Sequence, residues 1–213
     1  MPEIKRAVVD ESKFNSQLVY PHSLRRTDFV SAMRDVYDFF GDVNENLTGR
    51  GLQRLDDMIR PAALSGMLSD MITDSVANHS RALTANLHHN GHPDLILKGR
   101  YSQDAVAAGT EGVEIKATRK PGGAVDTHGA RDQTLCVWVY EVDNDRLKSV
   151  YDREPLTIRE IYIGDVVVDD FRKNERGDLG TRTATLHGVG IKKFREGWIY
   201  LDRVARGHSE WRA

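Results

Sequence analysis

The sequence has almost no cysteine, no long apolar run and little net charge. Its single cysteine, Cys136, excludes an internal disulfide and a cysteine-based zinc cluster. No apolar run is long enough to cross a bilayer, and the opening MPEIKRAVVDESKF lacks the apolar stretch of a secretory signal. We therefore expect a protein of the cytoplasm, where thiols stay reduced, with no membrane partner.

The low net charge also argues against one kind of nucleic-acid binding, the non-specific kind. A formal charge of −2 argues against a protein that coats nucleic acid without specificity, because such binding needs a strongly positive field. A nuclease remains open, since acids at a metal site can offset a basic groove elsewhere. The phosphate-binding pattern GxxxxGK[ST] is also missing, which argues against an ATP-driven motor.

The length and the spacing of apolar residues predict one domain, 1–213, with helices first and strands afterwards. A chain of 213 residues, 39% of them hydrophobic, can bury a real core. Helical spacing predicts three helices, over 27–40 (ended by Gly41), 50–60 and 63–87. Alternation of apolar and polar residues predicts strands over 94–101, 112–118, 134–142, 156–164, 165–173, 181–189 and 197–202. A turn is predicted at Gly164 and a hairpin tip at NERGDLG.

The segment TLCVWVYEV, 134–142, decides the fold class. It is apolar on both alternating faces, which is typical of a central strand covered on both sides. The glycine-rich loop before it has room for one short helix after Asp126 or Thr127. The order helix, strand, strand, short helix, strand predicts an α/β (α+β) fold with a mixed β-sheet flanked by helices. The last part, 143–213, is predicted to be rich in β-hairpins.

Two predicted strands carry a group of charged residues. Asp94 opens the first, directly after Pro93, and Glu114 and Lys116 lie in the second. Because side chains alternate along a strand, Glu114 and Lys116 share one face, and Asp94 can reach that face if the strands pair. The pattern therefore predicts two carboxylates and an ammonium at one place. The alternative is a solvated strand face with ordinary charges.

These residue types suit the cleavage of a phosphodiester. Two carboxylates can hold Mg²⁺, which prefers oxygen ligands, and the backbone carbonyl of Ile115 can be a third ligand. The metal can polarise the phosphate and activate a water molecule. Lys116 would lie beside the attacking water and the scissile phosphate, where it can orient the water and offset developing charge.

Four segments together resemble the PD-(D/E)XK nuclease superfamily, and type II restriction endonucleases in particular. They are HPDLILKG, GVEIKATRK, GARDQ and LCVWVYEV. The resemblance implies a restriction-endonuclease-like catalytic core over 64–142, in which the two carboxylates bind the metal and the lysine is catalytic. The helical extension 1–63 and the strand-rich part 143–213 would then carry DNA recognition or dimer contacts.

The resemblance also implies a function and its partners. We expect a Mg²⁺-dependent endodeoxyribonuclease, with Mn²⁺ as a substitute, that hydrolyses double-stranded DNA at a short specific sequence. Such a sequence is usually palindromic, so a two-fold homodimer would present one active site to each strand. A cognate DNA methyltransferase is expected in the same system.

Three further residues are accessory candidates on the same resemblance. Gln133 can support the site by a hydrogen bond to a metal-bound water or a phosphate. His128 can approach the phosphate, with a loop or helix-cap role as the alternative. Asp74 is the candidate for an additional acid from the helix before the first strand, where the alternative is a solvated helix acid.

Basic residues flank the glycine-rich loop that follows the second strand. They are Arg119, Lys120 and Arg131. Glycines allow a backbone to come close to DNA, and the basic side chains can bind phosphates or read guanine. The alternative is ordinary surface charge.

Three other functions remain open from the sequence. One is a repair or recombination nuclease with the same core that reads DNA structure. Another is a DNA-binding module without catalysis, and the last is a protein-interaction domain whose motifs arose by chance. The intact set of Asp94, Glu114 and Lys116 argues against the non-catalytic module.

Overall fold

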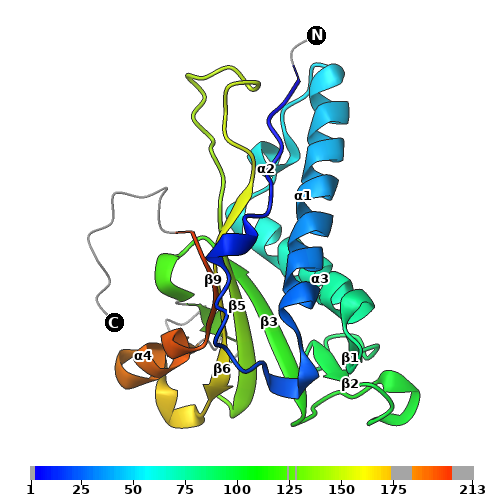
Figure 1. Ribbon diagram of the computed structural model, residues 1–213, viewed down its shortest axis with the longest axis vertical. Coiled ribbons are helices and arrows are strands. Elements are labelled where there is room, and N and C mark those ends of the chain that lie inside the picture. Colours follow the sequence, from blue (N-terminus) through cyan, green and yellow to red (C-terminus); the bar gives the residue numbers. More distant parts are fainter. Residues whose placement is uncertain (1–2, 124, 128, 174–183, 203–213) are drawn as a thin grey trace, which may run out of the picture.

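The computed structural model describes residues 3–123, 125–127, 129–173 and 184–202, which form helices and strands around a mixed sheet (Figure 1). The helices are α1 (Arg26–Gly49), α2 (Leu55–Met58), α3 (Pro61–His79) and α4 (Gly188–Glu196). The strands are β1 (Leu83–Ala85), β2 (Leu95–Leu97), β3 (Gly112–Thr118), β4 (Asp126–Thr127), β5 (Gln133–Glu141), β6 (Thr157–Val166), β7 (Phe171–Lys173), β8 (Ala184–Leu186) and β9 (Trp198–Leu201). In this part of the chain, no helix has both the length and the apolar character that a membrane crossing requires.

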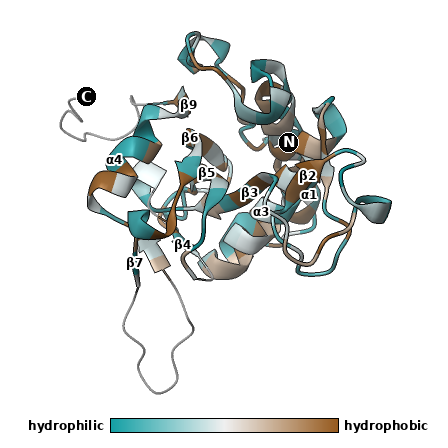
Figure 2. Cartoon of the chain, turned by 90° about the horizontal axis from the view of Figure 1, so that it is seen from below, coloured by the Kyte–Doolittle hydropathy of each residue, from teal (hydrophilic) through white to brown (hydrophobic). Residues whose placement is uncertain are grey.

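Six strands form the main sheet in the order β1-β2-β3-β5-β6-β9. The pair β3 and β5 runs parallel, whereas the other neighbouring pairs run antiparallel. A smaller sheet has the order β4-β8-β7. Seen from below, α1 and α3 lie on one side of β3, and α4 with the smaller sheet lies on the other (Figure 2). The predicted α/β architecture, a mixed sheet flanked by helices, is confirmed.

The central strand β5 packs apolar side chains against both layers. One face carries Cys136, Trp138 and Tyr140, which pack with the residues of α1 and α3. The opposite face carries Leu135 and Val137, in a second cluster that includes Phe194 of α4. The prediction of a central strand covered on both sides is therefore confirmed, and burial of these side chains on both faces is the main force that holds the layers together.

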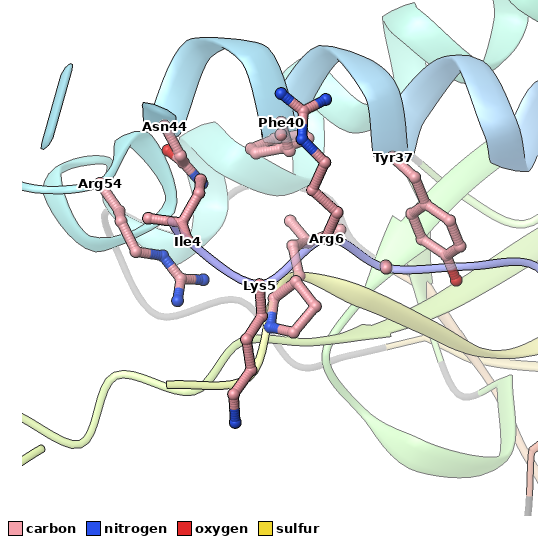
Figure 3. A pocket seen from close by; sticks show the side chains of 11 residues that line it. Ile4, Lys5, Arg6, Tyr37, Phe40, Asn44 and Arg54 are labelled. Atoms are coloured by element: carbon pink, nitrogen blue, oxygen red, sulfur yellow. The ribbon is translucent and has the colours of Figure 1, made fainter. Parts of the chain in front are cut away.

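The helix predicted to end at Gly41 continues to Gly49, and the N-terminal segment packs against it at Gly41. Arg6 lies across the helix at Gly41, and a Cβ added to Gly41 would lie 2.9 Å from Nη1 of Arg6. The guanidinium bonds Asp42 at 2.6 Å and Glu45 at 2.5 Å. Figure 3 shows the side chain of Arg6 extending from the N-terminal segment to the helix near Phe40. Gly41 is thus a contact point inside the helix, and the prediction that it terminates the helix was wrong.

The helix predicted over 63–87 is shorter, because its last part is a strand. The helix α3 ends at His79, and the hydroxyl of Ser80 accepts the N–H of Leu83 at 3.0 Å. Leu83 then pairs with Leu97 of β2. Apolar residues at helical spacing were misleading here, since pairing with a distant strand outweighs local periodicity.

In the second half of the chain, two predictions were wrong, one helix was missed and one predicted hairpin is confirmed. The strand β6 continues through Gly164, the predicted turn. A short helix was predicted after Asp126 or Thr127, but Asp126–Thr127 form β4, and the described residues 129–132 that follow contain no helix. The helix α4 was not predicted. The predicted hairpin is confirmed, because β7 and β8 pair antiparallel with Phe171 opposite Leu186. Its tip lies outside the described residues.

Candidate active site

The pairing of β2 with β3 brings the predicted charged residues together. Leu95 pairs with Val113 in antiparallel register, so the preceding residue, Asp94, lies beside Glu114. Lys116 follows on the same face of β3, and its Nζ lies 3.6 Å from Asp94 Oδ2 and contacts Glu114 Oε1. The three side chains therefore form one charged cluster on the face opposite α3.

Backbone geometry fixes where β2 meets β3. Gly112 has φ 148°, and a Cβ there would lie 2.0 Å from the carbonyl oxygen of Leu95. Only glycine tolerates both this conformation and this approach. The register next to Asp94 thus depends on a residue without a side chain.

The carboxylate of Asp94 replaces a strand partner for β3. Asp94 directly precedes the first residue of β2, and its Oδ2 accepts the backbone N–H of Ile115 at 2.8 Å. The N–H and C=O of one strand residue point to the same side, so the carbonyl of Ile115 also faces Asp94. The N–H of Ala117 faces this side too and is accepted by the hydroxyl of Ser69 at 2.9 Å.

The cluster is mostly buried, and this shapes its charge states. Burial raises the pKa of Asp94. Burial also works to raise the pKa of Glu114, yet the hydrogen bond from His92 and the charge of Lys116 lower it to about 2. Burial disfavours the charged form of Lys116, but the charges of Glu114 and Asp94 raise its pKa. Lys116 is therefore an ammonium, suited to neutralising charge and unsuited to accepting a proton.

Sequence reasoning missed His92. Its Nδ1 lies 2.7 Å from Glu114 Oε2, and 14% of its side chain is exposed. No local pattern distinguishes it from His88 and His89 in the same loop, because its partner, Glu114, lies 22 residues further along the chain.

Asn86 clamps the loop that carries His92. Its Nδ2 donates to the carbonyl of Pro93 at 3.0 Å and to that of Val106 at 2.8 Å. Its Oδ1 accepts the N–H of Val106 at 3.0 Å. The same Oδ1 also accepts the N–H of His88 at 3.1 Å. The two N–H groups of this amide thus join the segments that precede and follow β2, and this fixes the backbone next to Asp94.

The cluster offers a donor set that fits Mg²⁺. The donors are the carboxylates of Asp94 and Glu114 and the carbonyl of Ile115, all oxygen, and Mg²⁺ usually keeps several waters beside one or two carboxylates. In the described part of the chain, no group of three or more His, Cys, Asp and Glu side chains is arranged to hold a metal. The fit therefore depends on two carboxylates completed by a carbonyl and water.

Gln133 lies on the same face as the charged cluster. Leu135 pairs with Glu114, and Gln133, two residues earlier on β5, shares its face. Its Nε2 is buried and has no hydrogen-bond partner among the described residues. A buried amide without a partner is unusual, so this group is suited to donate to a ligand.

Three of the remaining predicted residues, Asp74, Arg119 and Lys120, have their surroundings or partners away from the cluster. Asp74 is exposed on α3, whose apolar stripe packs on the opposite face of the sheet. The guanidinium of Arg119 donates to the carbonyl of Val142 at 3.3 Å, and Lys120 pairs with Asp126. Arg131 is half-buried between β4 and β5. His128 lies outside the described residues.

Comparison with protein-family models, with curated proteins and with solved structures gives no match.

Proposed function

We propose that this chain is a Mg²⁺-dependent endodeoxyribonuclease of the cytoplasm, with a restriction-endonuclease-like core, that cuts double-stranded DNA at a short specific sequence. The observation that carries the proposal is the ammonium of Lys116, which contacts the carboxylates of both Asp94 and Glu114. This arrangement matches the PD-(D/E)XK pattern by residue type and by position on two paired strands. A homodimer and a cognate DNA methyltransferase in the same system belong to the proposal.

The residues of the cluster divide the work of hydrolysis. The reaction joins a water oxygen to phosphorus and breaks the bond to one bridging oxygen, to which a proton passes. Asp94, Glu114 and the carbonyl of Ile115 would hold the Mg²⁺, which when bound supplies Lewis-acid stabilisation of the phosphate. Lys116 orients the water and offsets the charge that develops on the phosphate oxygens. Gln133 offers a neutral donor to the same phosphate.

A cleavage assay on plasmid DNA tests this function. With Mg²⁺ the protein is expected to give discrete fragments, and a chelator is expected to stop cleavage, because the site needs an added cation. The control is Asp94→Asn purified in parallel, which exposes any contaminating nuclease. Cleavage confined to branched or damaged DNA would instead indicate a repair nuclease. Binding without any cleavage would indicate a non-catalytic module.

DNA binding should depend on Lys120 more than on Arg119. The side chain of Lys120 is 61% exposed, and its pair with Asp126, 44% exposed, is a surface contact that a phosphate can replace. We expect Lys120→Ala to weaken binding to all sequences and to reduce the slope of log affinity against log salt by about 1. Fluorescence anisotropy across a salt series measures both quantities.

The control for this prediction is Lys5→Ala. Lys5 is a similarly exposed lysine that pairs with Glu154 at 2.6 Å, in the N-terminal segment beside α1. Because α1 covers the face of the sheet opposite the cluster, this change should leave the slope unaltered. An equal effect of Lys5→Ala and Lys120→Ala would mean that DNA lies elsewhere.

A further inference from the structure

The carboxylate of Glu114 is held by two different donors, one on each oxygen. His92 Nδ1 lies 2.7 Å from Oε2, and the ammonium of Lys116 contacts Oε1. A carboxylate that lies between an ammonium and an imidazole accepts hydrogen bonds on both oxygens and donates none. The Nδ1 of His92 must therefore carry the proton that it donates.

The position of His92 is set by its backbone and not by its ring. Its N–H donates to the carbonyl of Ala107 at 3.2 Å, and its carbonyl accepts the N–H of Gly109 at 2.6 Å. Both bonds survive any change of side chain. The imidazole can therefore be altered without releasing the loop that precedes Asp94.

A carboxylate needs such a fixed donor if it is to keep one orientation. The terminal torsion of glutamate is broad, so Glu114 with Lys116 as its only partner would turn with the flexible lysine. The short, charge-assisted bond from His92 restrains Oε2. With Oε2 restrained, Oε1 alone is exchangeable between the ammonium and another cation.

We propose that His92 is a positioning residue for Glu114, which fixes one carboxylate oxygen so that the other is presented to the catalytic metal ion. This inference rests on the proposed nuclease function, because it assigns the metal to the same cluster. It gives His92 a role that acts through Glu114, without contact between the imidazole and the DNA.

Mn²⁺ binding to the full chain tests the proposal without relying on activity. Titration calorimetry or the electron paramagnetic resonance of free Mn²⁺ gives the affinity. His92→Ala should weaken Mn²⁺ binding by about 10–100-fold, the usual effect of losing a residue that orients a ligand. The exposed neighbour His89 supplies the matched control, His89→Ala, which should bind like the wild type.

Two amide variants test whether Mn²⁺ binding needs an N–H at the position of Nδ1 or only a polar side chain at residue 92. Asparagine puts an N–H close to the position of Nδ1, whereas glutamine puts it close to the position of Nε2. His92→Asn should therefore retain most of the Mn²⁺ affinity, and His92→Gln should lose it as His92→Ala does. The comparison of the two amides decides the matter even if His92→Ala fails to fold.

Each result has a definite meaning for the proposal. Wild-type affinity in His92→Ala, or equal affinity in the folded asparagine and glutamine variants, overturns the positioning role while the nuclease proposal stands. If the wild type binds no Mn²⁺ and Glu114→Gln changes nothing, the proposed function fails and this inference fails with it.

Discussion

Asp94→Ala, Glu114→Ala and Lys116→Ala are each expected to lower the rate of DNA cleavage at least ~100-fold, because removing one preorganised charge-stabilising group commonly costs that much. The losses should not add in double variants, since the three side chains act as one unit. Single-turnover cleavage of a plasmid gives the rates. Full activity in any single variant, or in a chelator, would falsify the mechanism.

Metal affinity should distinguish the roles of the three residues. Asp94→Ala and Glu114→Ala each remove a proposed ligand and should bind Mn²⁺ more weakly. Lys116→Ala should bind Mn²⁺ at least as tightly as the wild type, because the ammonium that contacts both carboxylates no longer competes with the ion. Weaker Mn²⁺ binding in Lys116→Ala would contradict the idea that lysine and metal share the same oxygens.

Arg54→Met is expected to lower the free energy of unfolding by about 3–5 kcal/mol, because it leaves a buried charge without its partner. The side chains of Arg54 and Asp56 are 3% and 0% exposed and form an ion pair. Asn44 donates to Asp56 at 2.7 Å, and Arg54 donates to the carbonyl of Glu154 at 3.0 Å. The pair thus joins α1, the start of α2 and the segment before β6, near Arg6 (Figure 3).

Two further variants test whether the loss of stability comes from the unpaired buried charge. The double variant Arg54→Met/Asp56→Leu should recover much of the loss, since replacing a whole buried pair by apolar groups is often neutral. Arg100→Met is the control, because its pair with Glu111 is 57% and 41% exposed, and an exposed pair contributes about 0–1 kcal/mol. Urea denaturation measures all three. A loss for Arg54→Met no larger than for Arg100→Met would show that the buried pair is not needed.

The parts of the fold that sequence could predict are those fixed by local pattern. The strand β3 was predicted with its observed bounds, Gly112–Thr118, because β-branched residues alternate there with charged ones. The strand β5 was predicted from its apolar character on both faces. The gathering of Asp94, Glu114 and Lys116 followed from strand alternation and one assumed pairing, and the structure contains that pairing.

The parts that could not be predicted depend on contacts between distant segments. Leu83 fitted a helical stripe, yet it pairs with Leu97 in a strand. Gly41 looked like a helix end, yet it accommodates Arg6 from another segment. His92 escaped notice because its partner, Glu114, is 22 residues away, and no local rule selects one histidine among several in the loop.

The start of β2, at Leu95, explains why Pro93 precedes Asp94. Continuing the register of β2 and β3 by two residues would put Pro93 opposite Ile115, whose N–H and carbonyl both face that side. Proline has no N–H to give to a ladder, so the carbonyl of Ile115 cannot be claimed by its neighbour. The hydrogen-bonded pairing therefore ends at Leu95 and Val113. The carbonyl oxygen of Ile115, which would accept a hydrogen bond from β2 in a longer pairing, stays without a strand partner there. Pro93 therefore ends the pairing of β2 with β3, and a residue with an N–H in its place would extend the sheet across the carbonyl oxygen of Ile115, the proposed third metal ligand.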